Sequence, residues 1–212
     1  MSWSAGRQTT REEDRAHCLL GIFNIAMPLI YGEGSGAFRR LQEEIIKRSN
    51  DLSIFAWDSS ELGHDQNRAV LLSSLANSAD DFVNGQNLIS CASDPAGFSV
   101  TNNGILLSGN VQLDLYSSDI QKHRFTYDLY YLVLGRGFGG PVGITLRKIG
   151  PDMFHRDGRF PITGMSWTKT GGASFRHAGY TPAKLHLITD QQAARLFFRN
   201  FRSHALHVPW GN

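Results

Sequence analysis

The sequence predicts an α+β fold, in which an N-terminal helical part packs on an antiparallel β-rich part, a sandwich or partial barrel. Two stretches near the N-terminus, over residues 11–23 and 35–48, carry apolar residues at helical spacing. From Phe98 onward the apolar residues alternate with polar ones, which is the pattern of half-buried strands. A polar stretch over 59–67 separates the two patterns. We place the boundary between the two parts there.

The first expected helix runs from about Arg11 to Phe23. Thr10 and Glu13 have the spacing of a capping box, in which the hydroxyl accepts from a first-turn amide and the carboxylate reaches back to the cap. Acidic residues in the first turn suit the positive end of the helix dipole. The apolar positions repeat at i, i+3, i+4 and i+7 and predict one core-facing stripe: Ala16, Leu19, Leu20 and Phe23.

A connection over residues 24–34 leads to the second expected helix, over about 35–48, with Phe38, Leu41 and Ile45 facing inward. Residues 53–57 are expected to form a short strand, and residues 78–82 a single capped turn of helix. Beyond Phe98, the Asn103-Gly104 pair predicts a tight hairpin, because these residues readily adopt the positive φ it needs. Further strands follow, and we expect a last helix over about 190–201.

Composition excludes several classes of protein. With 41% hydrophobic and 19% charged residues, the chain is typical of a globular protein, and its net charge of +2 gives no field that would recruit nucleic acid. Two cysteines are too few for a disulfide framework or a metal cluster. No signal-peptide pattern and no membrane-spanning run is present. We expect a soluble, cytoplasmic protein that binds neither nucleic acid nor membrane.

The order of motifs in roughly the first quarter of the chain resembles the C-terminal end of the fungal heterokaryon-incompatibility (HET) domain. The resemblance lies in residues 7–23, 27–34, 37–46 and 53–57, which include Tyr31-Gly32-Glu33-Gly34 and Ser53-Ile54-Phe55-Ala56-Trp57. His17 departs from it, since the family usually has Tyr there. The N-terminal, sheet-forming half of that domain has no counterpart. The resemblance implies a role in fungal non-self recognition and programmed cell death, and a distant similarity to TIR domains has been suggested for the family.

Residues 98–105 and 140–147 resemble, less specifically, the uncharacterised β-rich domain that follows the HET domain in many fungal proteins. We therefore expect residues 1–58 to be the C-terminal part of a HET domain, 68–202 to be this β-rich domain, and 203–212 to be a tail. On this interpretation the chain is a truncated HET-related protein.

Three motifs suggest catalysis, but the residues around each of them lack the rest of the catalytic pattern. The run from Gly135 to Gly140 fits a dinucleotide-binding pattern, but Pro141 and an alternating stretch follow where a helix is needed, so we predict a hairpin loop. His155-Arg156-Asp157 resembles a kinase catalytic loop without its partner motifs, and we predict a turn. The glycines at 32, 34 and 36 lack the lysine of a phosphate loop, which favours a flexible helix entry.

His204 and His207 have no further metal ligands at suitable spacing and are expected to lie in a polar tail. Arg195, Arg199 and Arg202 lack the aromatic platform of a nucleic-acid site. We therefore predict no catalytic, cofactor-binding or metal-binding residue and no cofactor.

The remaining candidate is a possible interaction surface at the start of the first helix, formed by Arg7, Arg11, Asp14 and Arg15. A solvated face with a local ion pair is the simpler interpretation of these charges. The resulting hypothesis is a non-enzymatic protein that acts through a protein partner or through self-association. The alternative is part of a TIR-like NAD hydrolase whose catalytic half lies outside this sequence.

Overall fold

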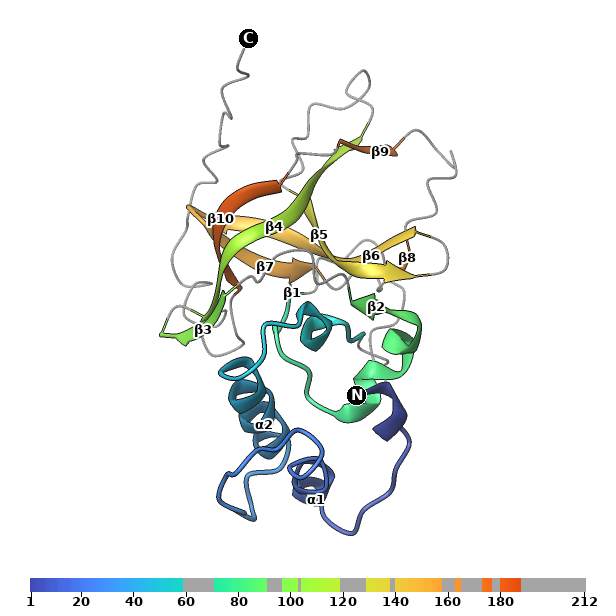
Figure 1. The fold of residues 1–212 in the computed structure, drawn as a ribbon, viewed down its shortest axis with the longest axis vertical. Coiled ribbons are helices and arrows are strands. Elements are labelled where there is room, and N and C mark those ends of the chain that lie inside the picture. Colours follow the sequence, from blue (N-terminus) through green and yellow to red (C-terminus); the bar gives the residue numbers. More distant parts are fainter. Residues whose placement is uncertain are drawn as a thin grey trace.

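The computed structural model in Figure 1 confirms an α+β fold. The structure describes residues 1–58, 71–90, 97–102, 104–118, 129–137, 140–157, 163–164, 173–176 and 180–187. Helices gather at one end of the described chain, and the strands form a sheet beside them (Figure 1). The expected helix over 190–201 and the arginines and histidines from Arg195 to His207 lie outside the described residues.

Among the residues that the structure describes, the helical part holds two α-helices and three 3₁₀ segments. The α-helices are α1 (Glu12–His17) and α2 (Gly36–Ile46). The 3₁₀ segments are η1 (Ser2–Ser4), η2 (Leu52–Phe55) and η3 (Ala79–Asn87). The capped turn expected at 78–82 is confirmed as the start of η3, because Ser78 and Asp81 form a capping box there.

The strands form one connected sheet with the path β1-β7-β10-β4-β5-β6-β8. Strands β2, β3 and β9 pair with β5, β4 and β4 beside that path. All described pairings are antiparallel except β10 with β7. The strand bounds are β1 Leu71–Leu72, β2 Ile89–Ser90, β3 Gly97–Thr101, β4 Gly104–Ser118, β5 Leu129–Gly137, β6 Gly140–Gly150, β7 Met153–Asp157, β8 Thr163–Gly164, β9 Ala173–Arg176 and β10 Tyr180–Leu187.

Two expected hairpins are present in the sheet. Strands β3 and β4 close where Thr101 pairs with Gly104, and Gly104 has a φ of 117°, which favours glycine. Strands β5 and β6 close where Gly137 pairs with Gly140. The glycine-rich stretch is therefore a hairpin connection between strands, as predicted, and no helix N-terminus follows it.

One hydrophobic core joins the helices to the sheet. Leu19, Leu41 and Phe55 are almost completely buried in the same cluster as the inward residues of β4, β5 and β6. The rings of Phe55 in η2 and Phe98 in β3 meet edge to face, with centroids 5.8 Å apart. The two predicted parts therefore share buried apolar surface, whose removal from water stabilises their association.

The first helix is shorter than predicted. α1 ends at His17, and tighter turns continue to Asn24, whose φ of 51° is left-handed. An Asn in this conformation is a common helix terminator. The predicted Thr10 cap is also wrong: Arg11 occupies the cap position without a side-chain bond, and the Glu13 carboxylate instead faces the loop before α2.

Two other local predictions are wrong. Residues 53–57 do not form a strand, because the Asp51 carboxylate accepts a hydrogen bond from the Ser53 amide at 2.9 Å and starts η2. His155-Arg156-Asp157 is not a turn but the buried end of β7, where His155 and Arg156 pair with β6 and Asp157 pairs with β1. The turn was predicted because the partner motifs of a kinase loop are absent, but the three residues are buried.

The corrected cap lowers the effect expected of Thr10→Ala, and Leu19→Ala provides the comparison. Leu19→Ala should lower the free energy of unfolding by about 2–5 kcal/mol, because it empties a buried site. Thr10→Ala should change it by less than about 0.5 kcal/mol, since Thr10 is exposed and does not cap the helix. Urea denaturation of both variants measures the difference. A loss of more than about 1 kcal/mol for Thr10→Ala would restore the capping box.

Candidate interaction surface

Tyr31 joins two residues of the predicted interaction surface. The Arg11 guanidinium lies over the Tyr31 ring, with its carbon 4.9 Å from the ring centroid. The Tyr31 hydroxyl donates to the Asp14 carboxylate at 3.1 Å, and this bond raises the pKa of Tyr31. The His17 ring meets the same tyrosine edge to face at 5.5 Å. Arg11, Asp14, His17 and Tyr31 therefore form one cluster, which we call the Tyr31 cluster.

Arg15 points to a different partner. Its guanidinium donates to the Asp80 carboxylate and, at 3.2 Å, to the Ser78 hydroxyl at the start of η3. The Gly6 amide donates to the other oxygen of Asp80 at 2.7 Å. The sequence suggested a local ion pair with Asp14, but this arginine links α1 to the N-terminal loop and to η3.

Arg7 lies beside the same loop. Its guanidinium carbon is 5.4 Å from the centroid of the Trp3 ring, and both side chains are exposed. The structure therefore divides the four predicted residues. Arg11 and Asp14 meet at Tyr31, Arg15 is held by Asp80, and Arg7 stacks on Trp3.

Glu13 holds the glycine loop before α2. Its Oε1 accepts hydrogen bonds from the Gly32 amide at 2.7 Å and the Gly34 amide at 3.1 Å. Both glycines have positive φ, at 94° and 54°, so the loop needs residues that tolerate this conformation. The loop amides, which the sequence offered as a weak phosphate-loop candidate, thus bind a carboxylate of the chain itself.

These bonds predict a loss of stability in acid. Hydrogen bonds from backbone amides, its own first and then those of Gly34 and Gly32, lower the pKa of Glu13 from its ordinary value of 4.5. A carboxylate whose folded-state pKa is lowered contributes stability that is complete above the unfolded pKa and is lost as pH falls through the folded one. The melting temperature should therefore fall as pH drops below 4.5.

Glu13→Gln should flatten this acid decline, because the substituted side chain no longer titrates. Melting curves between about pH 7 and about pH 3 measure the slope. Glu44→Gln, a change on the half-exposed surface of α2, is the matched control. Equal slopes for the wild type and Glu13→Gln would show that Glu13 does not carry the effect.

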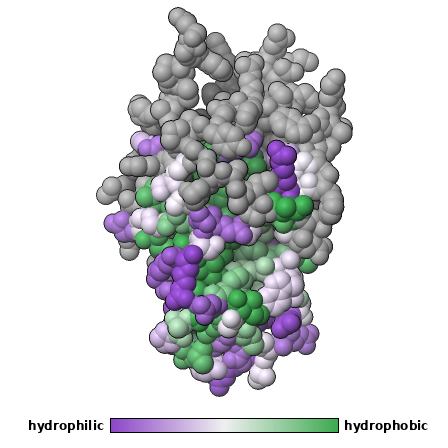
Figure 2. Space-filling model, in the orientation of Figure 1, coloured by the Kyte–Doolittle hydropathy of each residue, from purple (hydrophilic) through white to green (hydrophobic). Residues whose placement is uncertain are grey.

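Apolar side chains are exposed beside the Tyr31 cluster. Leu29, Ile30 and Tyr31 are consecutive in the connection to α2 and are 58%, 47% and 51% exposed. Tyr and Arg are enriched at the energetic centres of protein interfaces, and exposed aliphatic neighbours add apolar contact area. Figure 2 shows hydrophobic and hydrophilic residues intermixed over the helical half of the face in view. The Tyr31 cluster with Leu29 and Ile30 has the composition of a binding surface.

The described residues hold no group of three or more His, Cys, Asp and Glu side chains that could bind a metal ion. Among the helices that the structure describes, none has the length and apolar character needed to cross a membrane.

Sequence reasoning missed the roles of Tyr31 and Asp80 and the hydrogen bonds that the Glu13 carboxylate accepts. Tyr31 lies in the Tyr-Gly-Glu-Gly run that carries the HET resemblance, so an aromatic residue there was visible, but its position over α1 was not. Asp80 lies 65 residues from Arg15, and no local signal pairs residues at that separation.

Comparisons with known proteins place the chain in context. Residues 36–125 match the model of a family described as a domain of unknown function, DUF8212, in a range that starts at α2 and extends beyond β4. Over 48 residues, the chain is 56% identical to the vegetative incompatibility protein HET-E-1 of Podospora anserina. That match covers 22% of this chain and 4% of the relative, so the chain spans only a small part of the relative's length. No solved structure matches.

Proposed function

We propose that this chain, a relative of the fungal heterokaryon-incompatibility proteins, works in vegetative incompatibility by binding a protein partner or a second copy of itself. The match to HET-E-1 supports the biological role. In this proposal the chain is cytoplasmic, triggers or modulates cell death through contact and carries out no reaction of its own.

The observation that carries the proposal is the Tyr31 cluster, in which Arg11 and Tyr31 are exposed, with its aliphatic neighbours. The stacked Arg11 and the hydrogen bond to Asp14 hold the Tyr31 side chain in one orientation before any partner arrives. An ordered side chain loses less conformational entropy on binding, which leaves more of the contact energy as affinity. Leu29 and Ile30 would then lose their exposure to water at the contact.

The positions and contacts of the motifs that suggested catalysis also favour this proposal. The Glu13 carboxylate accepts the hydrogen bonds of the Gly32 and Gly34 amides in the loop before α2, and strands β5 and β6 pair at Gly137 and Gly140. His155 and Asp157 are buried in β7, with 1% of each exposed, where a substrate has no direct access. None of these groups is arranged to receive a nucleotide in the part of the chain that the structure describes.

Co-precipitation from fungal hyphae tests the binding surface. Two differently tagged copies of the full chain are expressed together, and the proteins retained on one tag are compared between the wild type, Arg11→Ala and Lys47→Ala. Lys47 is an exposed cation on the far end of α2 and is the matched control. We expect the second copy or a host protein to be retained by the wild type and Lys47→Ala but lost with Arg11→Ala. If the wild type and both variants retain the same proteins, the Tyr31 cluster is not the binding surface.

The alternative is an NAD-hydrolysing enzyme similar to TIR domains. Glycosidic cleavage of that kind needs a positioned carboxylate beside a closed nucleotide pocket. Purified protein should release no nicotinamide from NAD above a buffer control. Steady release that is lost when one acidic residue is replaced by its amide would favour the enzyme over the interaction protein.

A further inference from the structure

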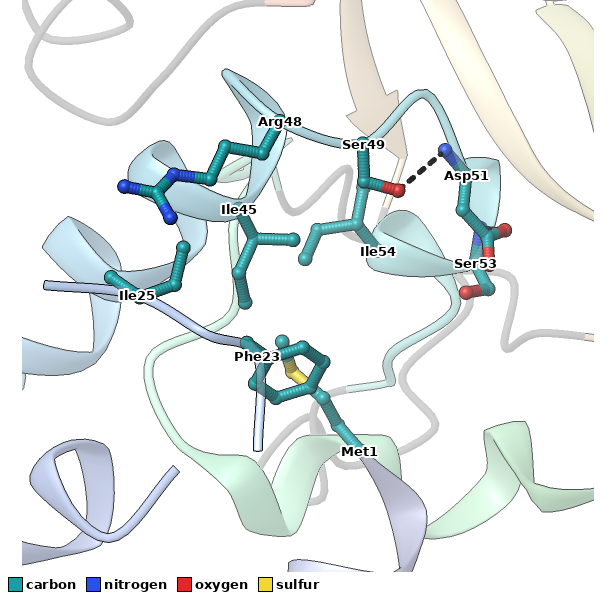
Figure 3. A pocket seen from close by; sticks show the side chains of 9 residues that line it. All are labelled: Met1, Phe23, Ile25, Ile45, Arg48, Ser49, Asp51, Ser53 and Ile54. Carbon is teal, nitrogen blue, oxygen red and sulfur yellow. Dashed lines mark hydrogen bonds between the residues drawn. The ribbon is translucent and has the colours of Figure 1, made fainter. Parts of the chain in front are cut away.

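A cavity lies between the turn after α1, the C-terminal end of α2 and the start of η2. Its volume is about 230 Å³. Figure 3 shows its lining residues, which are Met1, Phe23, Ile25, Ile45, Arg48, Ser49, Asp51, Ser53 and Ile54. No residue of the Tyr31 cluster lines it, so the cavity is separate from the proposed binding surface.

Apolar side chains from four separate segments form the wall of this cavity. Ile25, Ile45 and Ile54 are 7%, 8% and 6% exposed and belong to the hydrophobic core, against which Phe23 and Met1 pack. An engineered cavity of about 150 Å³ with an entirely apolar lining stays dry and binds benzene. The larger space here therefore has room for a ring or a branched chain of that size, with a few further atoms.

Polar groups lie at the mouth of the cavity, and they differ in the hydrogen bonds that they already form. Asp51 caps η2 through the Ser53 amide, and its own amide donates to the Ser49 hydroxyl at 3.2 Å. The Asp51 carboxylate also attracts the Met1 ammonium group, whose pKa burial lowers and Asp51 raises. Arg48 is exposed and donates through Nη1 to the Asn24 carbonyl. A guanidinium has five donors, so Arg48 keeps donors that an incoming acceptor can use.

We infer that this cavity binds a small monocarboxylate with an apolar body, an aromatic or branched aliphatic acid, whose carboxylate meets Arg48. The apolar body replaces water against Phe23 and the isoleucines, and the carboxylate stays at the mouth, where it keeps part of its hydration. An ammonium ligand would place a like charge beside Arg48, and a neutral ligand would leave the guanidinium unused.

NMR titration of the full chain with isoleucine methyl groups labelled tests this site, with 3-phenylpropionate as the probe. The methyl signals of Ile25, Ile45 and Ile54 should shift and saturate at millimolar acid, while that of Ile105 in β4 should not move. The uncharged analogue 3-phenylpropionamide should bind about fivefold more weakly, since it cannot pair with the exposed Arg48. Arg48→Gln should weaken the acid to the level of the amide, and the control Lys47→Gln should leave both affinities unchanged.

Three results would overturn the inference. Cavity methyl signals that stay in place at tens of millimolar acid would show that the space binds no such ligand. Equal affinities for the acid and the amide would assign the cavity to a neutral apolar group, such as the side chain of a partner protein. Equal shifts at Ile105 and at the cavity methyls would show unspecific association. None of these outcomes depends on the Tyr31 cluster, so the proposed function is tested separately.

Discussion

Arg156→Met should lower the free energy of unfolding by about 3–5 kcal/mol, because it removes one side of a buried, charged contact. Arg156 is 2% exposed at the end of β7. Its guanidinium donates to the Trp57 carbonyl and, at 3.3 Å, to the Phe55 carbonyl, and its carbon lies 3.9 Å from the centroid of the Trp57 ring. This one side chain ties the sheet to the segment that follows η2.

The buried charge explains the size of the expected effect. Burial lowers the pKa of Arg156 to about 10, and the nearby charges of Asp58 and Asp81 partly oppose that shift. Removing the cation leaves two backbone carbonyls without their donor and takes a positive charge away from near Asp58 and Asp81. Unsatisfied buried groups cost more than the bond itself contributes, so an apolar residue of similar length cannot compensate.

Urea denaturation monitored by tryptophan fluorescence measures the loss, and Trp57 reports directly on the broken contact. Arg136→Met, at an exposed position in β5, is the matched control and should change stability by less than about 0.5 kcal/mol. A loss of less than about 1 kcal/mol for Arg156→Met would show that the contact does not hold the two parts together.

Gly143→Ala should destabilise the sheet by about 1–3 kcal/mol or more, because the added methyl group has no space. A Cβ at this position would lie 2.1 Å from the Leu132 carbonyl oxygen and 2.9 Å from a ring carbon of Tyr131. Both neighbours belong to β5, which is paired with β6 along its length and cannot move without breaking that pairing. The clash is with backbone, so rotation of a side chain cannot relieve it.

Thermal melts of Gly143→Ala beside Gly150→Ala separate this clash from a general effect of removing glycine. A Cβ at Gly150, also in β6, would meet only ordinary contacts with Met153, at 3.6 Å or more. The control should melt close to the wild type. A melting temperature for Gly143→Ala equal to that of the control would show that the two strands are not packed as closely as the structure has them.

Local patterns predicted the elements whose causes are local. The apolar stripe of α2 and the Asn-Gly hairpin follow from periodicity and turn chemistry, and both are present. The end of α1 was misplaced because the apolar spacing continues to Phe23, while the left-handed Asn24 closes the segment through turns. Residues 53–57 have strand-like composition, but Asp51 caps a 3₁₀ turn there.

Features that depend on contacts distant in the sequence were beyond local patterns. His155-Arg156-Asp157 has the polar composition of a loop, and only its register with β6 and the carbonyls about 100 residues earlier explain its burial. Within the candidate surface, Arg11 and Asp14 both contact Tyr31. Their meeting at Tyr31, and the pairing of Arg15 with Asp80, come from the tertiary fold.

The central claim is that the Tyr31 cluster acts by recognition and not by supporting the fold. An incompatibility assay with the full chain tests it most directly, with cell death scored for Arg11→Ala, Leu19→Ala and Lys47→Ala. The melting temperatures of the same purified variants are measured beside it. Since Arg11 is exposed and its contacts lie on the surface, Arg11→Ala should melt within a few degrees of the wild type. We predict that it nevertheless abolishes cell death, while Lys47→Ala signals normally and Leu19→Ala fails only in proportion to its lost stability. Normal signalling by Arg11→Ala together with failure of Leu19→Ala would contradict the claim and leave α1 as a packing element.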